Sequence, residues 1–146
     1  MGTITFPQAN DIKKVIKILN ADESQVKDKE LMMKKLDITY RQILYYYSAC
    51  QYLEILTSDY SFTEEAKNIK LEGISNRKKW LVKKILSKPV FSHVFNFYLA
   101  NNKLMSKDEI ICILLSEESV QSVNVAERRT GTVVSWMRWI IEELGL

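Results

Sequence analysis

Two short clusters of side chains carry groups that form directional hydrogen bonds with a planar or an anionic partner. The first is Thr39-Tyr40-Arg41-Gln42, with Tyr45 one helical turn further on. A guanidinium donates two parallel hydrogen bonds to guanine, and a carboxamide both donates to and accepts from adenine. The second cluster places hydroxyl groups, which suit phosphates or base edges, after two adjacent arginines. It consists of Arg128, Arg129, Thr130, Thr132 and Ser135.

A third group is purely cationic. Arg77, Lys78 and Lys79 lie within one helical turn, and Lys83 and Lys84 follow without any intervening acid. Such a run neutralises phosphates, each contact adding roughly one unit to the salt dependence of binding. The formal net charge of +3 permits a nucleic-acid partner without requiring one. For all three clusters, the alternative interpretation is a solvated helix surface.

Few residues of the sequence have the types and the spacing of a catalytic site. His93 is the single histidine, and Cys50 and Cys112 are isolated cysteines in apolar stretches, so no metal site or catalytic triad is expected. Asp59 with the segment 65–67 (Glu-Ala-Lys) resembles a nuclease metal motif, but its spacing is too short. We therefore expect a binding protein without catalytic site or cofactor. No segment approaches the ~20 apolar residues of a membrane span, and we expect a cytoplasmic protein.

The elements that must position these clusters are mainly helices, because the chain has only four glycines and two prolines. Between the third and fourth helices, two β-prone triplets flank the turn 57–59 and predict a small hairpin. Thr63 then caps the next helix. Apolar periodicity predicts helices at about 12–19, 27–36, 39–53, from 64 onward, 77–86, 90–99, from 107 onward, and 126–144.

Three helices followed by a hairpin is the order of a winged helix. The second half of the chain repeats this order of elements with fewer turn-forming residues between them. We expect two winged-helix (helix-turn-helix) units packed together, at residues 1–72 and 73–146. The second half ends at 145–146, where the first half begins its hairpin. We therefore expect either that the second unit lacks a wing or that the chain is a fragment of a longer protein.

The first half resembles winged-helix DNA-binding domains in the pattern Arg41-Gln42-x-x-Tyr45-Tyr46, followed by residues 52–56 and 60–63. With Ala126-Glu127-Arg128-Arg129-Thr130-x-Thr132-Val133-x-Ser135-Trp136-x-x-Trp139, the chain resembles the paired winged-helix modules of restriction–modification proteins, including type II restriction endonucleases. The resemblance covers nearly the whole chain. It implies target-site recognition for a nuclease domain in the same or another chain. One departure is Glu54, which stands where such domains often have the glycine that starts the wing.

The sequence thus predicts specific binding to double-stranded DNA, with one recognition helix in each half. The DNA-binding residues would be Thr39, Tyr40, Arg41, Gln42, Tyr45, Arg77, Lys78, Lys79, Arg128, Arg129, Thr130, Thr132 and Ser135. A transcriptional regulator has the same chemistry and stays open as an alternative. A protein-interaction or dimerisation module of winged-helix fold also stays open, as does oligomer formation.

Overall fold

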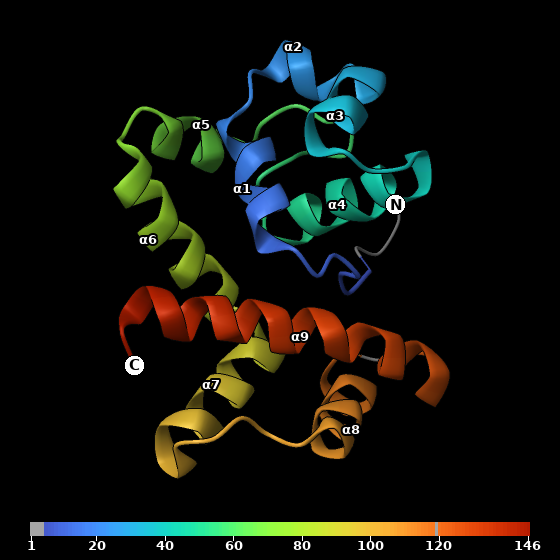
Figure 1. Ribbon diagram of the computed structural model, residues 1–146, viewed down its shortest axis with the longest axis vertical. Helices are drawn as coiled ribbons and strands as arrows, with labels where there is room; N and C mark the ends of the chain where they lie inside the picture. The colour runs from blue at the N-terminus through green and yellow to red at the C-terminus, as the bar shows by residue number, and fades with distance from the viewer. Residues whose placement is uncertain (1–4, 119) are drawn as a thin grey trace. The chain divides into compact units, whose positions relative to one another are not determined.

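The computed structural model describes residues 5–118 and 120–146, and the regular secondary structure in these ranges is entirely α-helical (Figure 1). The prediction of a mainly helical chain is confirmed. The helices are α1 (Ile12–Asn20), α2 (Glu23–Val26), α3 (Lys29–Leu36), α4 (Tyr40–Tyr52), α5 (Glu64–Lys70), α6 (Ile74–Leu86), α7 (Pro89–Asn101), α8 (Lys107–Glu117) and α9 (Val123–Leu144).

The chain forms two compact units, Met1–Trp80 (unit 1) and Leu81–Leu146 (unit 2). The division falls inside α6, whereas the sequence places a boundary between residues 72 and 73. Unit 1 contains α1 to α5 and the first part of α6. Unit 2 contains the remainder of α6 and α7 to α9.

The core of unit 1 lies between α1, α3 and α4. Helix α1 begins after Asp11, whose carboxylate accepts a hydrogen bond from the Lys13 amide at 3.0 Å and so caps the helix. Its buried residues recur at helical spacing, as do those of α4. The Tyr47 hydroxyl of α4 is buried and donates a hydrogen bond to the Val26 carbonyl. This contact joins α4 to α2 across the core.

The sequence indicates a simple break between two helices at residues 20–24, but a helix begins within this segment. The short helix α2 begins within it at Glu23, and α3 starts at Lys29 rather than near residue 27. Asp22 initiates α2, and its amide donates to the Gln25 side-chain carbonyl at 3.0 Å. The cluster of polar residues therefore acts as a helix start.

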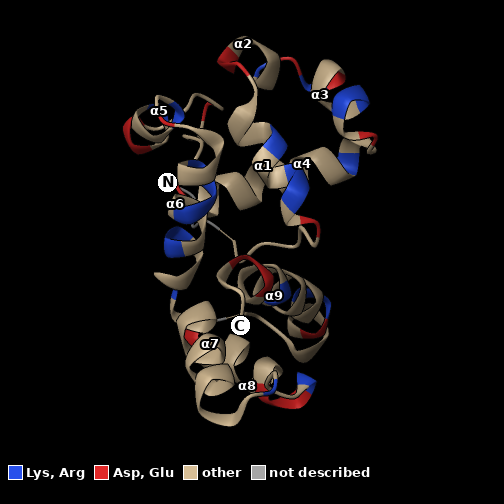
Figure 2. Ribbon diagram, turned by 60° about the vertical axis from the view of Figure 1, so that its left-hand side comes forward, with Lys and Arg blue, Asp and Glu red and all other residues tan. Residues whose placement is uncertain are grey.

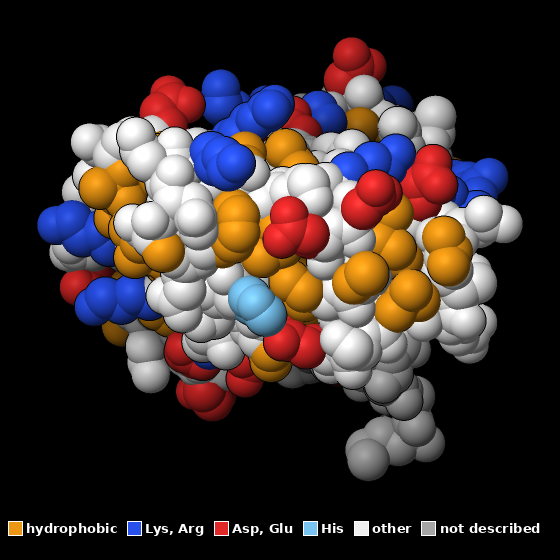
Figure 3. Space-filling model, turned by 90° about the horizontal axis from the view of Figure 1, so that it is seen from below, with side chains coloured by type: hydrophobic (Ala, Val, Ile, Leu, Met, Phe, Trp, Pro, Cys, Tyr) orange, Lys and Arg blue, Asp and Glu red, His pale blue; other side chains and the backbone are white. Residues whose placement is uncertain are grey.

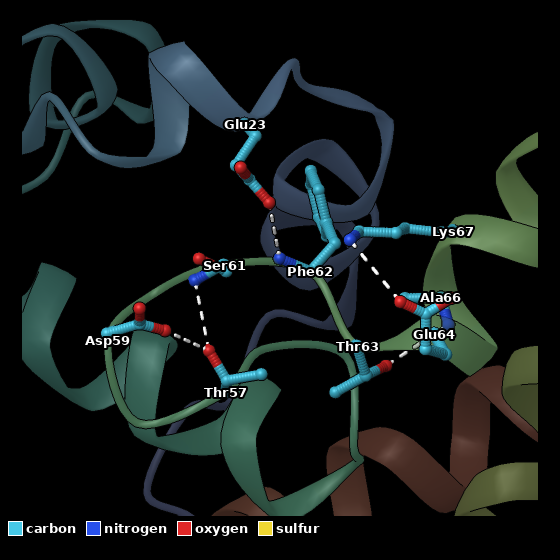
Figure 4. Close-up of polar contacts among 9 residues, drawn as sticks. All are labelled: Glu23, Thr57, Asp59, Ser61, Phe62, Thr63, Glu64, Ala66 and Lys67. Carbon is cyan, nitrogen blue, oxygen red and sulfur yellow. Dashed lines mark hydrogen bonds and ion pairs between the residues drawn. The ribbon is translucent and has the colours of Figure 1, made fainter.

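The predicted β-hairpin wing is wrong for the described residues, which contain one isolated antiparallel bridge, Leu56 to Phe62, and no strand. Backbone hydrogen bonds from the Thr57 amide to the Ser61 carbonyl (2.8 Å) and from the Thr63 amide to the Ile55 carbonyl (3.0 Å) flank this bridge, and two side-chain contacts add to them (Figure 4). The Phe62 amide donates to Glu23 Oε1 at 2.9 Å, and the Ser61 amide donates to Thr57 Oγ1 at 3.2 Å. In addition, Glu54 (φ 60°) and Tyr60 (φ 65°) have left-handed backbone, which interrupts extended structure on both sides. The segment is a compact loop that ends at the predicted cap Thr63.

In unit 2, the long helix α9 lies across α7 and α8 (Figure 1). The Trp136 ring of α9 stacks on the Phe91 ring of α7, with centroids 5.2 Å apart and an interplanar angle of 18°. Both side chains are fully buried, so this pair forms the centre of the unit. None of the described helices combines the length and the apolar character needed to cross a membrane.

Two apolar residues that the sequence places in the core of unit 2 are exposed. The segment 90–99 is apolar nearly all round, which predicts a buried helix, but Leu99 is 56% exposed near the end of α7. Helical spacing predicts Leu144 on the inner face of α9, but this residue is 46% exposed. Both lie in the last turn of a helix, beyond the neighbouring helices that cover the preceding turns. Hydrophobic side chains are accordingly visible at the surface in several groups (Figure 3).

Candidate nucleic-acid interface

Helices α3 and α4 are joined by a turn of three residues. Helix α3 ends at Leu36, and Asp37 takes the left-handed conformation (φ 54°, ψ 55°) that reverses the chain direction. The Ile38 amide then bonds back to the Met33 carbonyl at 3.0 Å, closing the end of α3. Thr39 caps α4, because its hydroxyl accepts a hydrogen bond from the Gln42 amide. The turn between the two helices has the length found in helix-turn-helix motifs.

Packing decides which face of α4 is free for contact with another molecule. Its apolar side is buried against α1 and α3. Helical spacing in the sequence predicts five inward-facing residues, and all five are buried: Ile43, Tyr46, Tyr47, Cys50 and Leu53. The opposite side of its first turn is exposed, and Tyr40 alone is 56% exposed. Thr39, Arg41 and Gln42 are exposed beside it, and Tyr45 is half-buried. The structure therefore brings all five predicted residues of the first cluster to one end of α4.

Arg41 is held along the neighbouring tyrosine. Its Nε and Nη2 atoms lie 3.4 and 3.3 Å from the Tyr45 hydroxyl oxygen, to which they donate. The guanidinium carbon lies 5.8 Å from the centroid of the same ring, within cation–π range. These contacts restrict the rotamers of Arg41 and direct its guanidinium along the exposed face of α4.

Gln42 has a structural role that the sequence did not predict for it. Its side-chain carbonyl accepts a hydrogen bond from the Thr39 amide at 3.0 Å, while the Gln42 amide donates to Thr39 Oγ1 at 3.3 Å. This reciprocal pair is a capping box, which stabilises the start of α4. Reading adenine requires the carbonyl and the amino group of one carboxamide together. Gln42 therefore does not present a complete adenine-reading group while it caps the helix.

The exposed end of α4 borders a concavity of about 470 Å³. Besides side chains of α4 and its cap, Gln8 and Asn10 from the segment before α1 line this concavity. The segment is attached to α4 because the Asp11 amide donates to the Tyr46 hydroxyl at 3.0 Å. No sequence pattern marked these two amides, since more than 30 residues separate them from α4. The complete lining is Gln8, Asn10, Thr39, Arg41, Gln42, Tyr45 and Tyr46, without a carboxylate.

Helix α3 adds positive charge near this end of α4. Its Lys29 ammonium lies 6.0 Å from the Tyr40 ring centroid and 4.8 Å from that of Tyr60. Lys34 and Lys35 are exposed in the last turn of the same helix, which contains a single acid, Glu30. The charge balance of α3 is therefore positive.

Arg77 occupies a structural position within unit 1 rather than a free surface. Its Nη2 donates to the Lys70 carbonyl at 2.6 Å, its Nη1 to Asn20 Oδ1 at 2.7 Å, and its Nε to the Glu72 carbonyl at 3.2 Å. These acceptors belong to the ends of α5 and α1 and to the turn before α6. The guanidinium thus connects three segments and acts as a structural clamp, a role that the sequence did not predict for it.

The remaining predicted cations of the third cluster lie on α6, which carries five basic residues and no acid (Figure 2). Lys79 is exposed, whereas Lys78 is half-buried. Trp80 on the same helix donates its indole N–H to Glu65 Oε2 of α5 at 2.9 Å. Lys79 is therefore the member of the predicted triplet best placed to contact an anionic partner.

The second predicted recognition helix does not present the surface expected of it. Thr132 is fully buried and Thr130 is 6% exposed, and the Thr130 hydroxyl donates to the Glu127 carbonyl at 2.7 Å. The buried face of α9 is wide because it packs on both α7 and α8, so these hydroxyls face the protein. The two threonines are therefore not part of the exposed surface of α9 that a contact with DNA would require. Of the other predicted residues, Arg129 and Ser135 are half-buried and Arg128 is exposed.

Arg128 lies beside a shallow concavity of about 500 Å³ lined by Lys107, Asn124, Glu127 and Arg128 itself. The Lys107 ammonium is 3.4 Å from Glu127 Oε1 and forms an ion pair with it. One positive charge of this group is therefore compensated, and Arg128 is the exposed cation that remains for a partner.

The candidate catalytic groups are scattered over the described residues. No three His, Cys, Asp or Glu side chains in that part of the chain form a group suited to a metal ion. His93 Nδ1 lies 3.0 Å from Glu117 Oε1 at the surface of unit 2. The thiol of Cys50 is fully buried, and burial raises its pKa. Asp59 sits in the loop, where a hydrogen bond from the Thr57 hydroxyl lowers its pKa.

No curated protein and no solved structure matches the chain. A family model described as "Domain of unknown function (DUF7226)" matches residues 14–144, which include α2 to α9. The chain therefore belongs to the DUF7226 family.

Proposed function

We propose that this protein binds double-stranded DNA in a sequence-specific manner, with the first turns of α4 in the major groove. The observation that carries the proposal is the α3–turn–α4 arrangement, which buries one side of α4 and leaves Tyr40 and Arg41 exposed on the other. A recognition helix needs this division between a packed side and a polar side that reaches the bases.

The charges around α4 favour the same partner. Helix α4 contains no acidic residue, so no carboxylate of its own opposes the phosphates. Exposed lysines of α3 lie just before it in the chain, and Lys79 is exposed on α6. Such cations would contact the backbone and fix the orientation of the protein, while Arg41 would read guanine.

In this proposal, base reading belongs to unit 1. The burial of Thr130 and Thr132 leaves α9 without the hydroxyl surface that base contacts would need. Unit 2 would contribute a phosphate contact through Arg128, which is exposed. The resemblance to restriction–modification modules suggests that such recognition serves a nuclease domain in the same or another chain, and a transcriptional regulator is the alternative.

Selection of bound sequences from a randomised duplex pool at about physiological salt tests this function. Enrichment of one motif is the expected result, and a motif that one helix can cover would agree with base reading by unit 1 alone. A pool that stays random, with binding only at low salt, would reduce the function to backbone contact. Absence of duplex binding at every salt concentration would overturn the proposal.

A protein-interaction module is the second candidate, and the surface of α7 favours it. Leu99 is 56% exposed, and Phe95, Phe97 and Tyr98 are half-buried on the same helix. Exposed apolar residues of this density are typical of surfaces that a partner covers. This candidate would be supported if the protein did not bind DNA but self-associated, and if Leu99→Lys made it monomeric.

A further inference from the structure

The turn between α5 and α6 carries two large aliphatic side chains that project into solvent. Leu71, which follows the last residue of α5, is 87% exposed, and Ile74, the first residue of α6, is 60% exposed. The turn lies at the edge of unit 1 (Figure 1). Such exposure forfeits the free energy that burial of the two side chains would contribute, so an apolar pair at one turn indicates a surface that a partner covers.

The positive charge of the protein is concentrated around the same turn. The α5–α6 corner, residues 67–79, contains five basic residues and one acid, Glu72. Its formal charge is therefore +4, whereas that of the whole chain is +3. Outside the corner, positive and negative charges nearly balance. The basic residues of the corner lie on α5 and α6 (Figure 2): Lys67, Lys70, Arg77, Lys78 and Lys79.

These charges remain effective although several of the side chains have hydrogen-bond partners. The Lys70 ammonium donates to two backbone carbonyls at the C-terminal end of α1, and the Arg77 guanidinium donates to two further carbonyls and a carboxamide. All of these acceptors are neutral, so they do not cancel the charge. Lys79 is exposed, whereas Lys67 lies 3.5 Å from the Glu64 carboxylate in a solvent-screened pair. The corner therefore surrounds the apolar pair with positive potential.

The Arg77 clamp fixes the backbone of the corner. Its guanidinium donates to the Lys70 carbonyl at 2.6 Å and to the Glu72 carbonyl at 3.2 Å, on either side of Leu71. The Glu72 amide donates to the Ile69 carbonyl at 3.0 Å and so closes the end of α5. Because the turn is already ordered, docking of the apolar pair does not require a loop to lose conformational entropy.

We propose that the α5–α6 corner docks on a membrane surface that contains anionic lipids, with Leu71 and Ile74 inserted among the headgroups. A bilayer surface offers apolar and anionic contacts side by side, which is the combination that the corner presents. The DNA backbone would offer phosphates to Lys79 but no apolar contact to the aliphatic pair. A lipid contact at this corner is independent of base reading by α4.

Co-sedimentation of the full chain with vesicles tests this proposal. The two compositions compared are phosphatidylcholine alone and phosphatidylcholine with about 30% phosphatidylserine. The protein should bind the second, more strongly at low salt, and not the first. Leu71→Gln and Ile74→Gln should each lower the partition coefficient roughly tenfold, and Lys79→Gln about fivefold. Leu144→Gln is the matched control, because this leucine is 46% exposed but has two acidic neighbours, and its effect should stay below about twofold.

A polarity-sensitive fluorophore separates insertion from purely electrostatic attraction. It is attached to the thiol of Leu71→Cys, in a chain that also carries Cys112→Ser because Cys112 is exposed. Its emission should shift to shorter wavelength when vesicles with phosphatidylserine are added, and should not change with phosphatidylcholine alone. Circular dichroism confirms that each variant is folded.

Three results would overturn the proposal. The first is wild-type protein that does not bind the phosphatidylserine vesicles; if Lys79→Gln then weakens duplex binding, the corner belongs to the DNA backbone instead. The second is equal binding to both vesicle compositions. The third is binding that Leu71→Gln and Ile74→Gln leave unchanged, or that occurs without a shift in emission.

Discussion

Replacement of Arg77 by alanine should destabilise unit 1 by about 2 kcal/mol. The side chain donates three hydrogen bonds, to the Lys70 carbonyl at 2.6 Å, to Asn20 Oδ1 at 2.7 Å and to the Glu72 carbonyl at 3.2 Å. Hydrogen bonds from a charged group contribute about 1.5–3 kcal/mol each when buried. Because the guanidinium is only half-buried, water replaces part of each bond, and the total is reduced to about 2 kcal/mol.

Urea unfolding followed by circular dichroism measures this loss. With typical slopes of about 1–3 kcal/mol per molar urea, the midpoint should fall by about 1 M. Arg77→Lys should recover less than half of the loss, because one ammonium group does not reach acceptors on three segments. Lys79→Ala is the matched control on the same helix, and its midpoint should stay unchanged because Lys79 is exposed. An Arg77→Ala variant as stable as wild type would refute the clamp.

Three further predictions concern buried groups. In native protein, a thiol reagent should modify Cys112 rapidly, because it is exposed, and Cys50 only after denaturant is added; equal rates would contradict the burial of Cys50. Burial raises the pKa of Tyr47 above its ordinary value of 10.0, so the folded state holds this proton more tightly. The contribution of this proton to the free energy of unfolding is complete below pH 10 and is lost as the pH rises further. In urea unfolding, the free energy of unfolding of Tyr47→Phe should therefore fall less steeply above pH 10 than that of wild type. A pH profile identical to that of wild type would contradict this prediction. Thr132→Lys places a charge at a fully buried position and should cost about 3 kcal/mol or more, whereas a folded variant with higher DNA affinity would restore Thr132 as a DNA contact.

Local patterns in the sequence predict much of α4 and its surroundings. The cap at Thr39 and the buried positions of α4 follow from helix-capping preferences and helical periodicity, which depend on neighbouring residues alone. The same reasoning places the cap at Thr63 and the mainly helical composition correctly. Exposure of Arg41 and Tyr40 also follows, since they lie opposite the apolar stripe.

Features that depend on distant segments were not predictable in this way. In place of the wing there is a loop with one isolated antiparallel bridge, whose Phe62 amide donates to the Glu23 carboxylate from a helix 39 residues away, a contact that local patterns do not reveal. Arg77 is a clamp because its acceptors include a backbone carbonyl and the Asn20 side chain, which its neighbouring sequence does not reveal. The burial of Thr132 follows from the two helices that α9 covers at once, a property of the assembled unit.

The proposed reading of a base by Arg41 can be tested by comparing the affinities for two duplexes. Fluorescence anisotropy at fixed salt would give the affinities of wild type, Arg41→Ala and Arg138→Ala for the selected duplex and for a scrambled one. Arg138 is an exposed arginine on α9 and serves as the matched control for charge. Arg41→Ala should lose about 1–3 kcal/mol of binding free energy on the selected duplex and much less on the scrambled one. Equal losses on both duplexes, or a loss matched by Arg138→Ala, would contradict it.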